Sequence, residues 1–280
     1  MCFLCDAKHS AWSGRRGFLL AAAGGAALAA TTPLRAQVAV GPSSGLRKLV
    51  PAEELEGAAA QEYAKLLADA RAQGALAPPG YAQLQRLRGI AGRLIPQATQ
   101  WNDRASQWRW EVNLIGSKQI NAFCMPGGKI AFYTGILEQL KLTDDEVAMI
   151  MGHEMAHALR EHARARIAKN QGTSMGLSAL SQLFGLGQLG DVAANIGTQL
   201  LTLRYSRDDE TDADLVGLEL AARGGYNPQA AVSLWQKMEQ SGGGANGPSF
   251  LSTHPSGPQR IQHLLDNVPK VQGLYQRARS

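Results

Sequence analysis

Apolar residues recur with helical spacing in two stretches that follow residue 50. In Pro51 to Gln73 and in Tyr81 to Ile95, apolar side chains lie three and four positions apart, which is the period of a helix with one buried face. Gly74 and a Pro-Pro-Gly run at 78–80 separate the two stretches. The pattern predicts two helices that pack on the domain that follows them.

Between residues 108 and 134 the apolar period becomes that of strands. Residues 108–114 alternate apolar and polar side chains up to Gly116, as in a half-buried strand. A second strand is predicted at 119–124 and a third at 129–134. The Pro-Gly-Gly run at 126–128 joins them, since glycine permits the positive backbone angles of a tight turn.

The second half of the chain returns to helical periodicity. One helix is predicted from Thr143 to about Lys169, because Thr143 and Glu146 match a capping box and apolar residues continue beyond it. Further helices are predicted at 208–223, 228–240 and 258–267. This order predicts an α+β fold, mainly helical with a small three-stranded sheet beside the helix at 143–169.

Residues 171–203 are apolar and punctuated by glycine, but polar residues interrupt every window long enough to span a bilayer. We expect helical packing or a mobile flap over the domain. The alternative is a segment that contacts a membrane surface peripherally.

The first 36 residues have the features of an export signal. Arg15 and Arg16 precede Gly-Phe-Leu-Leu and a mild apolar stretch that ends near Ala36, which resembles a twin-arginine signal peptide. We therefore expect a signal at 1–36, an N-terminal helical segment at 37–100, a main domain at 101–280, and the periplasm as location. A general secretory signal or an uncleaved anchor in the inner membrane is the alternative.

Composition agrees with one compact globular domain and excludes a nucleic-acid partner. The chain is 45% hydrophobic and carries a formal charge of +5, but residues 1–36 contain four basic residues against one acidic residue. The basic excess is therefore largely a property of the leader. The same leader holds two of the three cysteines, so the mature chain would keep only Cys124, which we interpret as a packed core residue.

The chemistry-bearing pattern lies inside the helix predicted at 143–169. His153, Glu154 and His157 form His-Glu-x-x-His, and residues four apart lie on one helix face, so both imidazoles can bind one metal ion. Glu154 is offset from that face and is predicted to be the general base.

A catalytic zinc ion needs three protein ligands and one open position. Glu210 and Asp214 stand four apart on a later predicted helix; one can bind the metal while the other orients a histidine ligand. His162 does not fit the longer zincin pattern, because Arg160 and Ala163 stand where glycine and histidine would be required. It is interpreted as a surface or packing residue.

Four motifs in this order resemble the gluzincin family that includes the HtpX heat-shock protease and the CAAX prenyl protease. They are His-Glu-x-x-His, the Glu210 and Asp214 pair, Asn-Ala-Phe at 121–123 with Pro-Gly-Gly at 126–128, and Ser-Thr-His-Pro at 252–255. The resemblance spans about residues 100 to 268 and implies a zincin-type metallopeptidase domain. It implies that His153, His157 and Glu210 bind one Zn²⁺, that Glu154 is the base, and that Asp214 supports a ligand or donates a proton.

The chain departs from membrane-embedded members, since no transmembrane helix is predicted after the leader, and from larger relatives, since no repeat domain follows residue 280. We expect a small exported bacterial member that acts on soluble envelope proteins.

Two further sites are predicted beside the metal. Asn121, Ala122 and Phe123 are expected to lie on an exposed sheet edge that binds an extended substrate as an added strand. His254 follows a glycine-rich loop, and two roles fit it: a latch in the open metal position, or a hydrogen-bond donor to the oxyanion. Arg260 is expected to anchor this region through acidic partners.

The predicted function is a zinc endopeptidase that hydrolyses unfolded or damaged envelope proteins in quality control. The alternative is a metal-binding envelope chaperone with marginal hydrolysis. An intact Glu154 favours the enzyme, because a structural metal site has no need of a base. The oligomeric state does not follow from the sequence.

Overall fold

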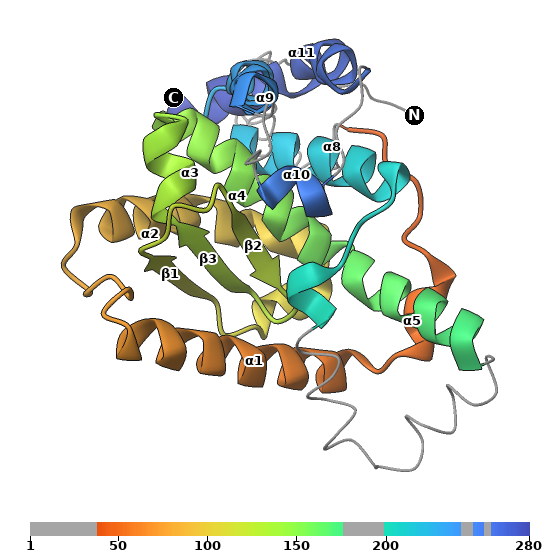
Figure 1. The fold of residues 1–280 in the computed structure, drawn as a ribbon. Helices are drawn as coiled ribbons and strands as arrows, with labels where there is room; N and C mark the ends of the chain where they lie inside the picture. Colours follow the sequence, from red (N-terminus) through yellow and green to blue (C-terminus); the bar gives the residue numbers. More distant parts are fainter. Residues whose placement is uncertain (1–37, 176–198, 242–248, 255–258) are drawn as a thin grey trace, which may run out of the picture. The chain divides into compact units, whose positions relative to one another are not determined.

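The computed structural model describes residues 38–175, 199–241, 249–254 and 259–280 (Figure 1). The export signal predicted at 1–36 and most of the segment predicted at 171–203 lie outside the described residues, as does most of the glycine-rich loop before His254.

Three strands form one mixed sheet in the order β1-β3-β2. β1 (Glu111–Ile115) runs parallel to β3 (Lys129–Tyr133), and β2 (Ala122–Met125) runs antiparallel to it. Gly127 and Gly128 between β2 and β3 both have positive φ, as expected for the tight turn. The sheet order makes β2 an edge strand within the described part of the chain.

Only the second half of the alternating pattern at 108–114 lies in β1, which begins at Glu111. Trp108 and Trp110 precede the strand, with ring centroids 5.3 Å apart. Their indole nitrogens donate to Glu56 Oε1 and to the carbonyl of Ala105, and both bonds are made outside the sheet. The alternation therefore came partly from a packed aromatic pair.

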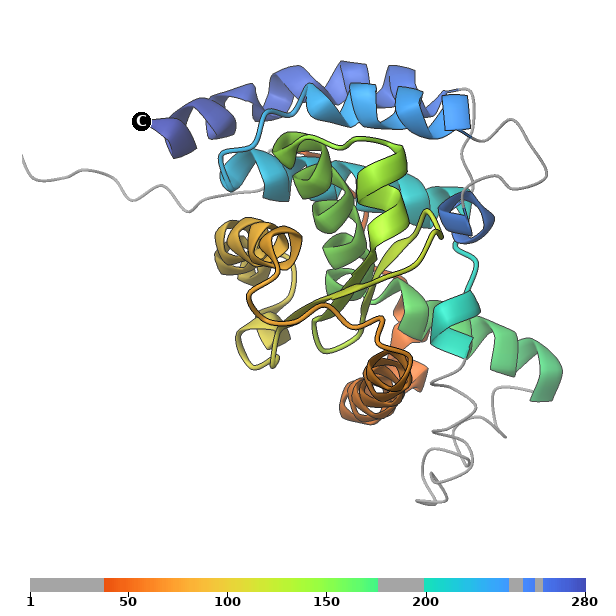
Figure 2. The same cartoon turned by 60° about the vertical axis from the view of Figure 1, so that its left-hand side comes forward.

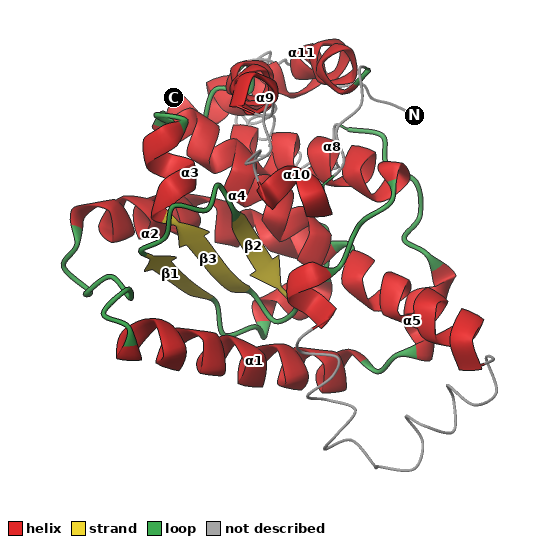
Figure 3. Cartoon of the chain, in the orientation of Figure 1, coloured by secondary structure: helices red, strands yellow, loops and turns green. Residues whose placement is uncertain are grey.

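Helices cover both faces of the sheet (Figures 1 and 2). α1 (Ala52–Ala72) contacts β2 and β3 from one side. On the other side α2 (Ala82–Leu94) contacts β1 and α4, while α4 (Asp144–Leu159) contacts β2. A short 3₁₀ helix at Gly45–Leu49 precedes α1, and two more, at Ile95–Gln100 and Asp103–Ser106, lie between α2 and β1. The predicted α+β class is confirmed, with loops and helices as drawn in Figure 3.

α4 and α8 (Arg207–Arg223) touch backbone to backbone where they cross. A Cβ atom added at Gly152 would lie 2.7 Å from the carbonyl oxygen of Gly217, and one added at Gly217 would lie 2.6 Å from the amide nitrogen of His153. Only glycine fits at either position, because a side chain would force the helices apart. This crossing brings the acidic start of α8 against the metal-binding face of α4.

The helix predicted from Thr143 to Lys169 is two helices. α4 ends at Leu159 and α5 begins at His162 and runs to Met175 (His162–Met175). Glu161 between them has φ 59°, a left-handed conformation that few non-glycine residues adopt and that no local sequence signal marked. The chain therefore changes direction immediately after the His-Glu-x-x-His motif.

The C-terminal helices lie over α8, on its side away from the sheet (Figure 2). α9 (Ala230–Ser241) matches its prediction closely, whereas α11 (Arg260–Arg279) passes through Pro269 instead of ending near Asn267. Pro269 has no amide hydrogen, so it makes no helical hydrogen bond to the carbonyl of Leu265, yet the helix continues through it. Two short helices, α3 (Thr134–Gln139) and α10 (Ser249–Thr253), were not predicted.

Candidate metal centre

α4 positions three of the predicted site residues in the protein interior. The capping box at its start is present, with Thr143 Oγ1 accepting from the Glu146 amide and Glu146 Oε2 accepting from the Thr143 amide. His153, Glu154 and His157, in the third and fourth turns, are each 4% exposed or less. Such polar groups are stable inside a protein only when they are paired or bind a ligand.

α8 brings a carboxylate to these histidines. Ser206 and Asp209 cap its N-terminus with a second capping box, and Glu210 lies in its first turn, 3% exposed. Glu210 Oε2 is 3.4 Å from His153 Nε2, and Glu210 Oε1 is 3.4 Å from His157 Nε2. The two nitrogens are 3.2 Å apart, so one carboxylate and two imidazoles converge on a single point.

His254, from the segment after α10, completes the cluster. Its Nδ1 lies 3.3 Å from His153 Nε2 and 3.0 Å from Glu210 Oε1. One ligand atom from each of His153, His157, Glu210 and His254 lies within 4.8 Å of the others. Ligands at zinc bond lengths of about 2.0–2.1 Å sit about 3.3 Å apart at the corners of a tetrahedron, so these spacings fit a zinc ion.

The electrostatics of the cluster also suit a cation. Burial alone would lower the pKa of His153, but hydrogen bonds with Asp214 and Glu210 outweigh it and raise the pKa to about 9. Burial lowers the pKa of His157 well below its usual value. Burial would raise the pKa of Glu210, yet its hydrogen bonds with the histidines reverse this and lower it. The ionised Glu210 therefore favours a positive charge beside it, which a divalent ion would supply when bound.

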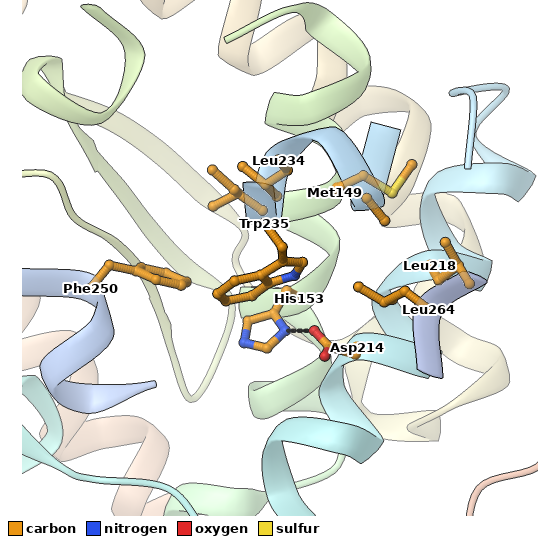
Figure 4. Close-up of a pocket in the computed structure, with 10 residues that line it drawn as sticks. Met149, His153, Asp214, Leu218, Leu234, Trp235, Phe250 and Leu264 are labelled. Carbon is orange, nitrogen blue, oxygen red and sulfur yellow. Dashed lines mark hydrogen bonds and ion pairs between the residues drawn. The ribbon is translucent and has the colours of Figure 1, made fainter. Parts of the chain in front are cut away.

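His153 is held from behind by a carboxylate and an arginine. Its Nδ1 donates to Asp214 Oδ1 at 3.0 Å, shown as the dashed line in Figure 4. Arg260 donates to Asp214 Oδ1 at 2.7 Å and to Glu210 Oε2 at 3.0 Å, so the acidic partners expected for Arg260 are present. Its guanidinium carbon lies 3.3 Å from the centroid of the Trp235 ring. A cavity of about 10 Å³, lined mostly by apolar side chains, backs this arrangement.

His157 has a different environment. Tyr205 stacks on its ring at 3.8 Å, and its Nδ1 lies 3.0 Å from Nδ1 of His162. His162 is 6% exposed, so the surface interpretation is wrong and the packing one is incomplete. It lies outside the metal cluster, as expected, but bonds directly to one of its members.

Glu154 faces the cluster without joining it. Its Oε1 is 3.5 Å from His254 Nε2 and has no hydrogen-bond partner among the described residues. Burial raises the pKa of Glu154, while the charges of His254 and His153 oppose the rise. A buried carboxylate with a raised pKa and an oxygen that makes no hydrogen bond is suited to accept and return a proton.

A cavity of about 210 Å³ runs from Glu154 and His254 along the edge strand β2. Asn121, Ala122 and Phe123, the residues predicted to bind substrate, all line it. Ala122 is fully buried, with 0% exposed, and Asn121 and Phe123 are half-buried, so this edge is less exposed than predicted. Apolar side chains at 200, 201 and 203 and Tyr205 form another part of its lining. The structure thus brings every predicted site residue except Asp214 to the metal cluster or to this groove, and Asp214 lies directly behind His153.

A scan against protein families matches residues 82–268 to peptidase family M48. The chain belongs to peptidase family M48. The match covers both metal-binding helices, the sheet and the segment that carries His254, and it confirms the resemblance to gluzincins. M48 peptidases are zinc-dependent, and zinc is the ion whose coordination the cluster fits.

Relatives of this M48 chain include eukaryotic metalloendopeptidases and bacterial metalloproteases. It is 39% identical over 155 residues to the mitochondrial metalloendopeptidase OMA1 of Arabidopsis thaliana, covering 55% of this chain and 31% of that protein. It is 36% identical over 169 residues to OMA1 of Schizosaccharomyces pombe, covering 60% and 49%. The metalloprotease YcaL of Escherichia coli is 27% identical over 158 residues, covering 54% and 59%. In each case the similar region spans less than two thirds of the relative.

No helix within the described residues of this M48 chain is long and apolar enough to cross a membrane.

Sequence reasoning missed His162 and Asp212 as partners of the metal cluster. A histidine five residues after the second motif histidine was the available signal, but on a continuous helix it would point away from His157.

Proposed function

We propose that this chain is a zinc-dependent endopeptidase that cleaves extended segments of proteins. The observation that carries the proposal is the position of Glu154, a buried carboxylate with one oxygen that makes no hydrogen bond to the described residues, between a four-residue metal cluster and a groove along a sheet edge. A structural metal site would need neither the base nor the groove.

In the proposed site, His153, His157 and Glu210 hold one zinc ion. The fit rests on the spacing of their ligand atoms and on the charge of the cluster. When bound, zinc supplies Lewis-acid chemistry that polarises the scissile carbonyl and makes a water molecule more acidic.

Glu154 performs the proton transfers. It takes a proton from the attacking water as oxygen adds to the carbonyl carbon, and it gives that proton to the amide nitrogen as the carbon–nitrogen bond breaks. Its raised pKa favours both steps near neutral pH, because the carboxyl group must be a base first and an acid second. Asp214 keeps the Nδ1 proton on His153 and thereby leaves Nε2 free for the metal.

The position of His254 favours the latch role in the conformation described. Its Nδ1 lies 3.3 Å from His153 Nε2 and 3.0 Å from Glu210 Oε1, which is the spacing between two ligands of one zinc ion. His254 therefore lies where a fourth ligand would sit. In the proposed cycle, substrate displaces His254 from this position, and the imidazole then has an oxyanion within reach. His254→Ala raises basal peptidase activity if the latch dominates and lowers turnover if transition-state support dominates.

Substrate is proposed to add to β2 as a strand. In an antiparallel pair, alternate main-chain groups of an edge strand point away from their partner, and the Ala122 amide donates to the adjacent Asn121 Oδ1 at 3.0 Å. Main-chain pairing would give loose, shape-based selectivity. Proline at Ala122 is expected to impair peptide turnover without loss of zinc; unchanged turnover would exclude this edge.

The proposed substrates are unfolded or damaged envelope proteins, because binding through main-chain groups needs an extended chain. The proposed location is the periplasm, reached by the twin-arginine route, with anchoring in the inner membrane as the alternative. Replacing Arg15 and Arg16 with lysine is expected to leave the precursor in the cytoplasm. Peripheral membrane contact through residues 171–203 stays a prediction. The same holds for the boundaries after residues 36 and 100, which separate the predicted signal, the N-terminal helical segment and the main domain.

The deciding experiment compares the wild-type chain with Glu154→Gln. We expect both to bind one zinc ion per chain, and only the wild type to hydrolyse an unfolded protein, with products absent after chelation and restored by added zinc. Proteins that accumulate on Glu154→Gln identify the substrates. If the wild type suppresses aggregation but cleaves nothing, and Glu154→Gln behaves identically, the chaperone alternative replaces the proposal.

A further inference from the structure

The break between α4 and α5 turns His162 back toward the metal cluster. Glu161 adopts φ 59°, and α5 begins at the next residue. The rings of His157 and His162 lie with centroids 5.0 Å apart at 75°, and their Nδ1 atoms are 3.0 Å apart. Both side chains are buried, so water does not compete for this contact.

The direction of this hydrogen bond follows from the other end of the His162 ring. His162 Nε2 lies 3.0 Å from Asp212 Oδ2, and an ionised carboxylate can only accept, so Nε2 carries the proton. When the His162 ring is neutral, its Nδ1 is then an acceptor and His157 Nδ1 is the donor. This leaves His157 Nε2 with its lone pair facing His153 Nε2, 3.2 Å away.

Asp212 is fixed in its turn. Arg160, at the end of α4, donates through Nε to Asp212 Oδ2 at 2.6 Å, and its Nη2 also donates to the carbonyl of Gly41. Asp212 lies on α8 between Glu210 and Asp214, so one helix supplies a zinc ligand and the carboxylates behind both histidines. The chain of bonds runs from Asp212 through His162 to His157.

We propose that His162 is a positioning residue of the metal centre: together with Asp212 it holds His157 in the tautomer and orientation that present Nε2 to zinc. The proposal rests on the proposed function, since it takes His157 as a ligand. Outer-shell partners of this kind contribute about 10- to 100-fold to metal affinity.

The test measures zinc affinity by competition with a chromogenic chelator, on folded protein. His162→Phe fills the same space without an acceptor and is expected to weaken zinc binding roughly 10- to 100-fold. His162→Asn places an amide oxygen near the former Nδ1 position and is expected to recover part of the loss. Ile167→Ala is the matched control, because Ile167 is fully buried on the same helix but packs in a separate cluster with Val50 and Leu55; it should bind zinc as the wild type does.

Nitrogen-15 NMR of histidine in the metal-free protein gives a second readout that lost packing alone would not produce. We expect His157 to carry its proton on Nδ1 in the wild type and to become a tautomer mixture in His162→Phe. Wild-type zinc affinity in His162→Phe, or an equal loss in Ile167→Ala, would overturn the positioning role. His157→Ala separates the two proposals: if it retains wild-type affinity, the ligand set itself is wrong and the role of His162 is lost with it.

Discussion

His153 and His157 lie one helical turn apart on the same face of α4, yet they are supported in different ways. His153 donates directly to a carboxylate, Asp214, which Arg260 holds in place. His157 is joined to Asp212 only through a second imidazole, that of His162. Both carboxylates come from α8, two residues apart. The crossing of α4 and α8 therefore places both supporting carboxylates. The local backbone after α4 determines that Asp212 acts through His162, whereas Asp214 contacts its histidine directly.

The largest expected effect comes from Glu210, the residue that contacts both histidines. Glu210 contacts His153 through one carboxylate oxygen and His157 through the other. Glu210→Ala should weaken zinc binding by more than roughly 100-fold, the upper end for outer-shell substitutions, because it removes a ligand and one of the two carboxylates that Arg260 contacts. Metal analysis after dialysis measures this; full zinc occupancy would remove Glu210 from the ligand set.

The next effect tests the crossing itself. Gly217→Ala places a methyl group 2.6 Å from the His153 amide nitrogen and 2.8 Å from the Gly152 carbonyl carbon. It should lower the free energy of unfolding by about 1–3 kcal/mol and weaken zinc binding, since both supports depend on α8. Gly89→Ala on α2 is the control, because its Cβ would meet nothing within 4 Å, and it should stabilise by about 0.5–1 kcal/mol. Equal behaviour of the two variants in urea unfolding would contradict the crossing.

A matched pair of substitutions compares the two supports directly. Asp214→Asn and Asp212→Asn keep shape and an acceptor oxygen but remove the charge. We expect Asp214→Asn to weaken zinc binding by about tenfold, and Asp212→Asn by less, because its charge acts on the ligand through an intervening ring. Competition with a chelator measures the ratio of the zinc affinities of the two variants. A larger loss for Asp212→Asn would reverse the ranking of the two supports.

The smallest effect concerns the aromatic ring behind His153. Arg260 lies over Trp235 with its guanidinium carbon 3.3 Å from the ring centroid. Trp235→Phe keeps an aromatic face and should lower the free energy of unfolding by about 0.5–1 kcal/mol, with zinc affinity nearly unchanged, since two carboxylates already orient Arg260. Thermal unfolding and zinc titration check this together. A large loss of zinc affinity would mean that the Trp235 ring, and not the carboxylates, determines the position of the Arg260 side chain.

The sequence could predict what depends on local pattern. The capping box at Thr143, the turn at Gly127 and Gly128, and the spacing of His153 and His157 all follow from short-range rules, and the structure contains each of them. Glu210 could be proposed because a zinc site needs a third ligand and an acidic pair with helical spacing was available.

The remainder depends on conformations and crossings that no single window encodes. Glu161 adopts a left-handed conformation without glycine, so no sequence signal marked the end of α4, and His162 was interpreted as a surface or packing residue. The pairing of Gly152 with Gly217 links residues far apart in the chain, and neither glycine stands out by itself. The helix through Pro269 shows the converse case, because the sequence predicted an end near Asn267 whereas α11 continues to Arg279.

The central claim is a single zinc ion held by His153, His157 and Glu210 beside the base Glu154. An anomalous-difference X-ray experiment on zinc-loaded Glu154→Gln crystals tests it most directly, because that variant keeps every proposed ligand. We predict one strong peak at about 2.0–2.2 Å from Nε2 of both histidines and from a carboxylate oxygen of Glu210. A peak that lacks any of these three ligands, or no peak between α4 and α8, would contradict the account.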